Sequence, residues 1–183
     1  MDATANDTPT SNGIEPLKFG KSGGRRADLL AARIEQGAAF LAAFAEGLSD
    51  EEWRKPVSDT DHRSVGVIVH HVATVYPIEI DLARAIANGN AVTDVTWAVV
   101  DRLNANHARE QADVTKDAAL ELLRRNSREA AAAVRGFTDD ELDRAAAFAL
   151  SLGAPVTTQY VIEDHAVRHS WHHLARIRKG LSR

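Results

Sequence analysis

The chain contains no cysteine, and this absence excludes several kinds of chemistry together. It has no disulfide framework, no thiolate nucleophile and no thiolate metal ligand of its own. With 183 residues it is nevertheless long enough to bury one core without cross-links. The sequence therefore predicts a single domain whose stability comes from packing.

An excess of positive charge is also lacking. The chain has 22 Lys and Arg against 26 Asp and Glu, a formal charge of −4, which argues against general nucleic-acid binding. The first residues, MDATANDTPTSNG, have no apolar signal-peptide core, and we find no apolar run of membrane-spanning length. We therefore expect a cytoplasmic protein with a small-molecule substrate and neither nucleic acid nor membrane as a partner.

What the sequence does contain is alanine-rich, helix-periodic segments, with 44% apolar residues overall. Residues 1–23 lack this periodicity and are predicted to form a mobile tail, followed by one domain over residues 24–183. Ser and Thr caps and terminal glycines delimit the helices. The pattern predicts an all-α four-helix bundle with antiparallel long helices, additional short helices and no strand. The long helices are expected at 25–47, 64–88, 116–135 and 157–179, and the short ones near 49–55, 93–112 and 138–150.

Half of the eight histidines lie in one short stretch, EDHAVRHSWHHLARI. In a helix, His169 and His173 are one turn apart, and both fall on or beside the apolar arc that includes Val167, Trp171 and Leu174. His165 and His172 are expected to point further toward solvent. The spacing of His169 and His173 lets two imidazoles reach one ion.

A third histidine faces inward from another predicted helix. His71 lies within a stripe formed by Ile68, Val75, Ile78 and Leu82, whereas the adjacent His70 lies outside it. Three histidines from two helices can form a metal site inside a bundle, and neutral imidazoles suit Zn, Ni, Cu or Fe. The sequence thus predicts one divalent metal on His71, His169 and His173, with an open position for water or substrate. The competing interpretation is that each of these histidines is simply a packing or surface residue.

Other polar and aromatic residues are weaker candidates, each with a structural alternative. Asn104 and His107 would contact substrate or supply a fourth ligand, or lie on a solvated helix face. Trp97 and Tyr76 would line a pocket or belong to the core. Arg168, Arg176 and Arg178 would hold an anionic cofactor or complement the dipole at a helix end. Glu163 and Asp164 would orient a ligating imidazole.

The motifs SVGVIVHHVA and RHSWHHLARI, in this order, resemble the histidine motifs of the DinB/YfiT-like metalloproteins. The resemblance covers about residues 25–180. It implies a four-helix bundle of unusual helix order, a divalent metal (Zn or Ni) on His71, His169 and His173, and a homodimer. It also implies that the chain could be a transferase that uses a low-molecular-weight thiol such as bacillithiol or mycothiol.

Three functions remain open at this point. In a thiol S-transferase, the metal would activate a small thiol for attack on an electrophile. In a metal-dependent hydrolase, bound water would be the nucleophile. The chain could instead be a non-catalytic metal-binding stress-response protein. We also expect a homodimer through the long helices, because the alanine-rich helix faces exceed what one four-helix core needs.

Overall fold

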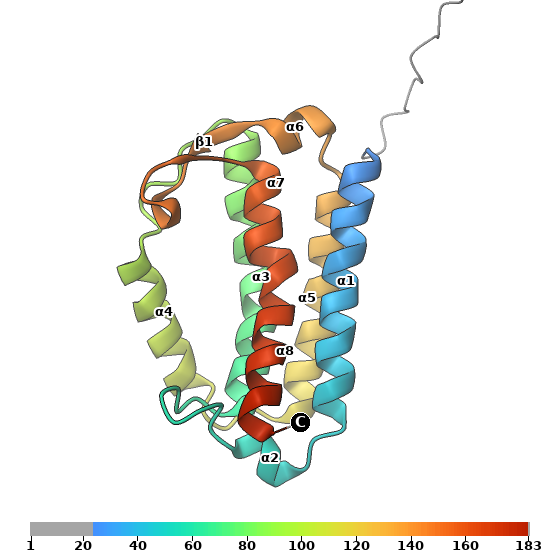
Figure 1. Cartoon of the computed structure of the whole chain (residues 1–183), viewed down its shortest axis with the longest axis vertical. Coiled ribbons are helices and arrows are strands. Elements are labelled where there is room, and N and C mark those ends of the chain that lie inside the picture. The colour runs from blue at the N-terminus through green and yellow to red at the C-terminus, as the bar shows by residue number, and fades with distance from the viewer. Residues whose placement is uncertain (1–23, 183) are drawn as a thin grey trace, which may run out of the picture.

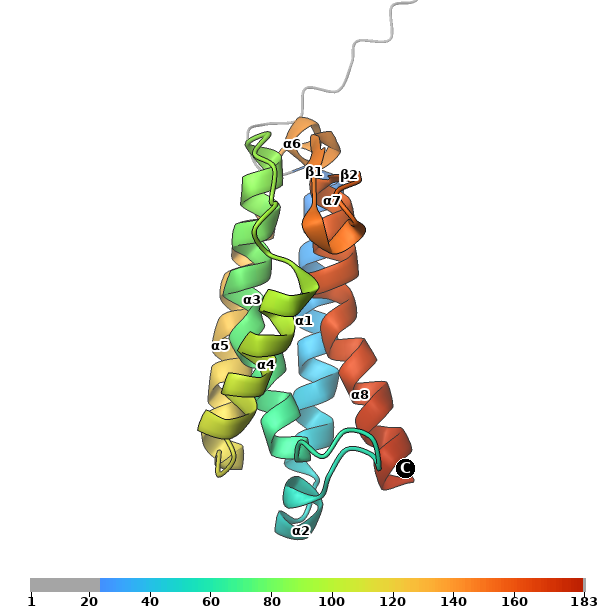
Figure 2. The same ribbon diagram turned by 90° about the vertical axis from the view of Figure 1, so that its left-hand side faces the viewer.

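A computed structural model describes residues 24–182 of the chain. The predicted tail, residues 1–23, lies outside the described residues. Within them, four long helical segments run side by side as a bundle (Figures 1 and 2), as the sequence predicted. They are α1 (Arg25–Glu46), α3 (Val65–Ala87), α5 (Lys116–Arg135) and the continuous segment of α7 (Thr158–Val161), η2 (Ile162–Val167) and α8 (Arg168–Leu181).

The order of the helices around the bundle differs from their order in the chain. α1 packs against α5 and α8, and α3 packs against α5 and α7–α8. The shorter α4 (Trp97–Glu110) returns along the outside of the bundle, so α5 starts at the same end as α3 and runs parallel to it (Figure 1). The expectation that all long helices are antiparallel was therefore wrong for α3 and α5, because a helical crossover separates them.

Side-chain caps explain why the helices start where they do. The Ser64 side chain accepts a hydrogen bond from the backbone N–H of Val67 at the start of α3, and Thr115 does the same for α5. Capping boxes begin the two short helices α2 (Asp50–Arg54) and α6 (Asp139–Asp143). Each cap satisfies an N–H that the first turn leaves without an intrahelical partner.

The core lies between the long helices and is built mainly from aliphatic side chains. α3 is long and apolar enough to cross a membrane by length and composition, contrary to the sequence prediction, but 61% of that apolar window is buried inside the bundle. Its fully buried Tyr76 shares a hydrogen bond of 2.7 Å with the Ser170 hydroxyl of α8. Such burial is typical of the central helix of a globular bundle.

The helix predicted to reach Leu150 ends at Asp143, so the prediction was wrong for its second half. The segment that follows is a β-hairpin. The strands β1 (Ala145–Ala147) and β2 (Pro155–Thr157) pair antiparallel. The turn between them contains the short 3-10 helix η1 (Ala149–Ser151), Leu152 at φ 59° and Gly153 at φ 80°. Ala147 and Ala149 also exchange backbone hydrogen bonds with Val92. Tertiary pairing thus satisfies backbone groups that a helix would otherwise have bonded, which overrides the helical preference of alanine.

The C-terminal helical segment contains a π-helical turn, η2, immediately before the histidines. A π turn inserts one extra residue into a helix and changes the phase of everything beyond it. For this reason the apolar arc expected from uniform helical geometry was partly wrong. Of the residues assigned to that arc, Trp171 is exposed, whereas Val167 and Leu174 are buried.

Candidate metal site

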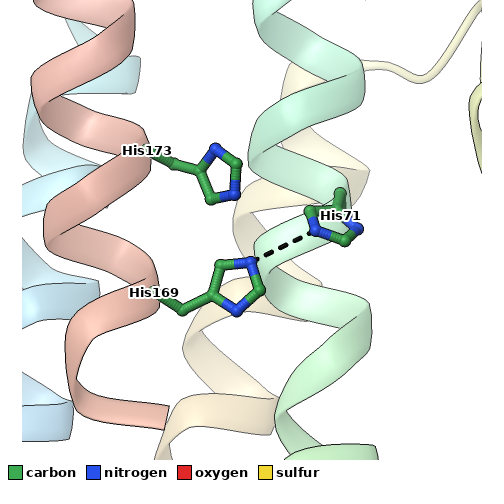
Figure 3. Close-up of side chains that lie close together, drawn as sticks. All are labelled: His71, His169 and His173. Carbon is green, nitrogen blue, oxygen red and sulfur yellow. Dashed lines mark hydrogen bonds between the residues drawn. The ribbon is translucent and has the colours of Figure 1, made fainter. Parts of the chain in front are cut away.

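Three imidazoles meet between α3 and α8 (Figure 3). His71 lies in the second turn of α3, and His169 and His173 lie one turn apart in α8. The Nε2 atoms of His71 and His169 are 3.2 Å apart. One ring nitrogen from each of the three histidines lies within 4.8 Å of the others. The structure therefore brings together the three residues that the sequence singled out.

A buried carboxylate orients one of these rings. The Nδ1 of His169 lies 2.5 Å from Oε1 of Glu79, which is two turns beyond His71 in α3. With Nδ1–H donating to the carboxylate, the Nε2 of His169 is left with a free lone pair directed at the other two histidines. A carboxylate behind a ligating histidine is a recurrent feature of protein metal sites, because it fixes the tautomer and raises ligand basicity.

The surroundings also favour the neutral, ligating form of the other two histidines. Burial, together with the neighbouring His169, lowers the pKa of His71 to about 3. Burial and the nearby His169 and His71 lower the pKa of His173 well below its usual range. Both rings are therefore neutral at physiological pH, the state in which imidazole binds a metal.

The geometry and the donor set fit a divalent transition metal. Nitrogens that share one tetrahedral ion at about 2.0–2.1 Å lie roughly 3.4 Å apart. The His71–His169 spacing of 3.2 Å is close to this value, and a ring nitrogen of His173 lies within 4.8 Å of both. The Nδ1 of His173 is buried without a hydrogen-bond partner among the described residues, so no protein group competes to hold this ring in another orientation.

The three histidines open into a cavity of about 410 Å³. One wall is apolar and comes from α3, α4, the segment between them and the hairpin turn, with Val75, Ile78, Leu82 and Trp97 among its residues. Arg63, His172 and Arg176 line another part of the cavity, and Arg168 lines it at the start of α8. Because all three histidines line this cavity, a metal that they held would be open to it, as in catalytic rather than structural metal sites.

The other histidines occupy distinct positions. His70 and His107 pair with each other, with Nδ1 and Nε2 2.8 Å apart, so His107 is engaged beside the site rather than placed as a fourth ligand. His172 is exposed, as predicted. His165 was expected to face solvent, but its side chain is only 18% exposed and it packs edge-on against Phe148.

The weaker candidates divide between the cavity and the rest of the protein. Asn104 and Trp97 line the cavity, whereas Tyr76 belongs to the core. Arg168 and Arg176 also line the cavity, whereas Arg178 lies over the ring of Phe44 outside it.

The acidic residues proposed to orient a ligand have other partners. Glu163 bonds to Arg33 and Gln159, and Asp164 bonds to Arg168. The acid that bonds to one of the three convergent histidines is Glu79, which sequence reasoning missed. A signal was present, since Glu79 is an acid within the most apolar helix of the chain and is only 5% exposed. A buried carboxylate requires a partner, and an inward histidine is the natural one.

These features define a helical-bundle protein with three convergent histidines that could hold a metal. The DinB superfamily model matches residues 25–177, so the chain belongs to the DinB superfamily. Among solved structures it is similar to YfiT from Bacillus subtilis, described as a probable metal-dependent hydrolase with an unusual four-helix bundle topology. That similarity has a TM-score of 0.69 at 20% identity and covers 92% of this chain and 94% of that one. At this identity it establishes the fold. A search of curated protein sequences found no match.

Proposed function

We propose that this protein is a divalent-metal-dependent transferase that acts with a low-molecular-weight thiol. The observation that carries the proposal is the convergence of three imidazoles from α3 and α8 beside a cavity of about 410 Å³, which would leave a metal held there open to a further ligand. A bound Zn or Ni ion would lower the pKa of a coordinated thiol and so supply a thiolate nucleophile at neutral pH.

The residues of the chain would have three tasks in this reaction. His71, His169 and His173 would hold the ion, and Glu79 would keep the Nε2 of His169 turned toward it. The apolar wall would exclude water from the reacting atoms and so protect the electrophile from competing hydrolysis. Since the chain has no cysteine, the sulfur nucleophile would come from the cofactor.

The choice of metal follows from the donor set. Three neutral imidazoles favour borderline ions such as Zn and Ni over the hard ions Mg and Ca. We infer Zn or Ni on this basis. We also infer a cytoplasmic location, because small thiols remain reduced there.

A metal-dependent hydrolase is the second candidate, since an open position can equally be filled by water. A hydrolase often uses a carboxylate as general base, but both carboxylates that line this cavity already have a partner. Glu79 is bonded to His169, and Asp164 is bonded to Arg168. Neither of these carboxylates is therefore free to act as the general base of a hydrolase. Non-catalytic metal binding is the third candidate, and the size of the cavity argues against it.

The proposal can be tested with protein purified without added metal, stripped and reloaded with Zn or Ni. We expect one ion per chain by elemental analysis. We expect metal-dependent consumption of an aryl halide or epoxide electrophile when bacillithiol, mycothiol, glutathione or cysteine is supplied. The same preparation is then assayed without thiol against activated esters and amides. Thiol-independent hydrolysis would assign the hydrolase, and a loaded protein inert in both assays would contradict catalysis.

A further inference from the structure

The cavity beside the three histidines has two chemically different ends. Toward the hairpin end of the bundle it is apolar, and several large side chains there are unusually open to solvent. Ile78 is 46%, Trp97 56% and Leu103 51% exposed, and all three line the cavity. The indole N–H of Trp97 donates to the carbonyl of Leu150, 3.2 Å away, which fixes this wall to the hairpin. An apolar wall held open beside a polar site is suited to an apolar part of a ligand.

The opposite end is basic. Arg63, from the loop before α3, and Arg176, from α8, both bond to Asp61, at 2.7 and 3.0 Å. One carboxylate thus serves two guanidinium groups and leaves one positive charge unbalanced. Arg168, elsewhere in the cavity, is balanced by Asp164 at 2.7 Å. The unpaired charge is therefore located at the Arg63–Arg176 end.

This loop is held firmly against α8. A Cβ added at Gly180 would lie only 2.0 Å from the carbonyl oxygen of Val57, so the loop backbone touches the helix one turn beyond Arg176. The Arg side chains are therefore presented by a fixed backbone, with 24% and 36% of the Arg63 and Arg176 side chains exposed. Two guanidiniums held in this way are suited to binding a carboxylate through paired hydrogen bonds.

The direction of the helices places the histidines between the two ends. α3 and α8 run in opposite directions (Figures 1 and 2). Arg63 precedes His71 and Arg176 follows His173, so both arginines lie at the same end of the bundle. Val75, Ile78 and Leu82 follow His71 by one, two and three turns toward the other end. A ligand that reaches from the arginines to this wall must therefore pass over the three histidines.

We propose that the site binds a small amphipathic monoanion, with a carboxylate on Arg63 and Arg176, an apolar body along Val75, Ile78 and Trp97, and its reacting atoms over the histidines. This deepens the proposed function, on which it rests, by naming the chemical class of the substrate. Arg176 lies three residues beyond His173, and Val75 lies four residues beyond His71 in the other direction, a combined rise of about 10 Å along the two helices. An eight-carbon acid therefore reaches from Arg176 to the nearer part of the apolar wall.

The test measures binding of octanoate by calorimetry and by tryptophan fluorescence, without any thiol, using stripped and Zn-loaded protein. Matched probes are 1-octanol, which lacks the charge, and acetate, which lacks the apolar body. We expect octanoate to bind at least about tenfold more tightly than either. Arg63→Gln and Arg176→Gln should each weaken octanoate about tenfold and leave octanol unchanged. Arg176→Lys should restore part of the affinity, and Arg178→Gln, on the same helix but outside the cavity, should have no effect.

Two results would overturn the proposal. Equal binding of octanoate by the Arg176→Gln and unmodified proteins would exclude the arginine end. Octanoate binding that requires Zn and ignores both arginines would mean that the carboxylate binds the metal. Because these measurements use no thiol and no turnover, they are independent of the transferase assay. Loss of fold in a glutamine variant would be seen in its circular dichroism, and Arg176→Lys then carries the comparison.

Discussion

Glu79 and His169 are joined across α3 and α8 by a contact of 2.5 Å between Oε1 and Nδ1. The carboxylate is almost fully buried, and its second oxygen has no partner among the described residues. An apolar helix would gain stability from an aliphatic residue at this position. The placement of a charged group here is best explained by what it does to the histidine.

Replacing Glu79 with glutamine should weaken metal binding by about 10- to 100-fold, because the amide still accepts a hydrogen bond but lacks the charge that makes the imidazole more basic. Competition with a chromogenic chelator measures the affinity. The matched control is Glu163→Gln, because Glu163, in η2, bonds to Arg33 and Gln159 instead. Equal affinities in the two variants would show that Glu79 has only a structural role.

Neighbouring histidines in α8 should respond oppositely to alanine substitution. His173→Ala removes one of the three convergent nitrogens and should abolish stoichiometric metal binding. His172→Ala removes an exposed ring and should leave it nearly intact, as should His70→Ala, since His70 pairs with His107. Elemental analysis after dialysis distinguishes them. Retention of metal by His173→Ala, with loss in His172→Ala, would mean that another set of ligands is used.

The metal-free protein should lose stability as the pH falls below about 6.5. His71 is neutral when folded, with its pKa lowered to about 3, whereas an unfolded histidine binds a proton near pH 6.5. The unfolded state therefore holds more protons over this range, so stability rises with pH by about 1 kcal/mol per pH unit for such a group. Urea unfolding at pH 7, 6 and 5 measures the slope. His71→Gln should reduce it, and an unchanged slope would contradict the neutral assignment.

Asp61 should stabilise the loop before α3 in a pH-dependent way. Its side chain is 13% exposed, and hydrogen bonding to Arg63 lowers its pKa from 3.8 to about 2. This shift in pKa corresponds to about 2 kcal/mol in the free energy of unfolding. The contribution is fully present at a pH above the pKa of the unfolded state and is lost as the pH falls through the pKa of the folded state. The difference in unfolding free energy between wild type and Asp61→Asn should thus shrink between pH 4 and 2. Asp81→Asn, in the exposed pair with Arg84, should cost only a few tenths of a kcal/mol.

A homodimer through the long helices stays a prediction, and the structure suggests which surface to test. Leu29 and Phe40 lie about three turns apart on one face of α1 and are both exposed, and the Phe40 ring contacts that of exposed Trp171 in α8. Sedimentation at micromolar concentration should give twice the monomer mass. Phe40→Glu should yield monomers, and Leu152→Glu, in the hairpin turn, should not. A monomeric mass for the unmodified protein would refute the dimer.

Local sequence signals predicted most of the helices, because caps and apolar spacing are decided by neighbouring residues. Ser64, Thr115 and the two capping boxes start helices where expected. The three inward histidines could be identified in the same way, since His71 and His173 sit on faces that burial dictates. The spacing of His169 and His173 by one turn survives any change earlier in the helix.

The features that were missed depend on contacts between distant segments. The hairpin at Ala145–Thr157 exists because its strands pair with each other and its backbone bonds to Val92. The alanine-rich sequence of this segment gives no local signal for that pairing. The parallel course of α3 and α5 follows from the path of α4. The role of Glu79 depends on His169, which lies 90 residues later in the chain. No periodicity in either helix encodes that pairing.

The π-helical turn at Ile162–Val167 has a further consequence for how this protein tolerates change in chain length. The N–H of Thr158 donates to the carbonyl of Arg144, which anchors the upstream end of the segment to the hairpin, while His169 and His173 must face α3 at the downstream end. The extra residue of the π turn lets the anchored end and the histidine face both keep the orientation that they need. Deleting one residue here would rotate the two ends by about 100° relative to each other. Insertions and deletions should therefore be far less acceptable between Thr158 and His169 than in the polar loop before α3.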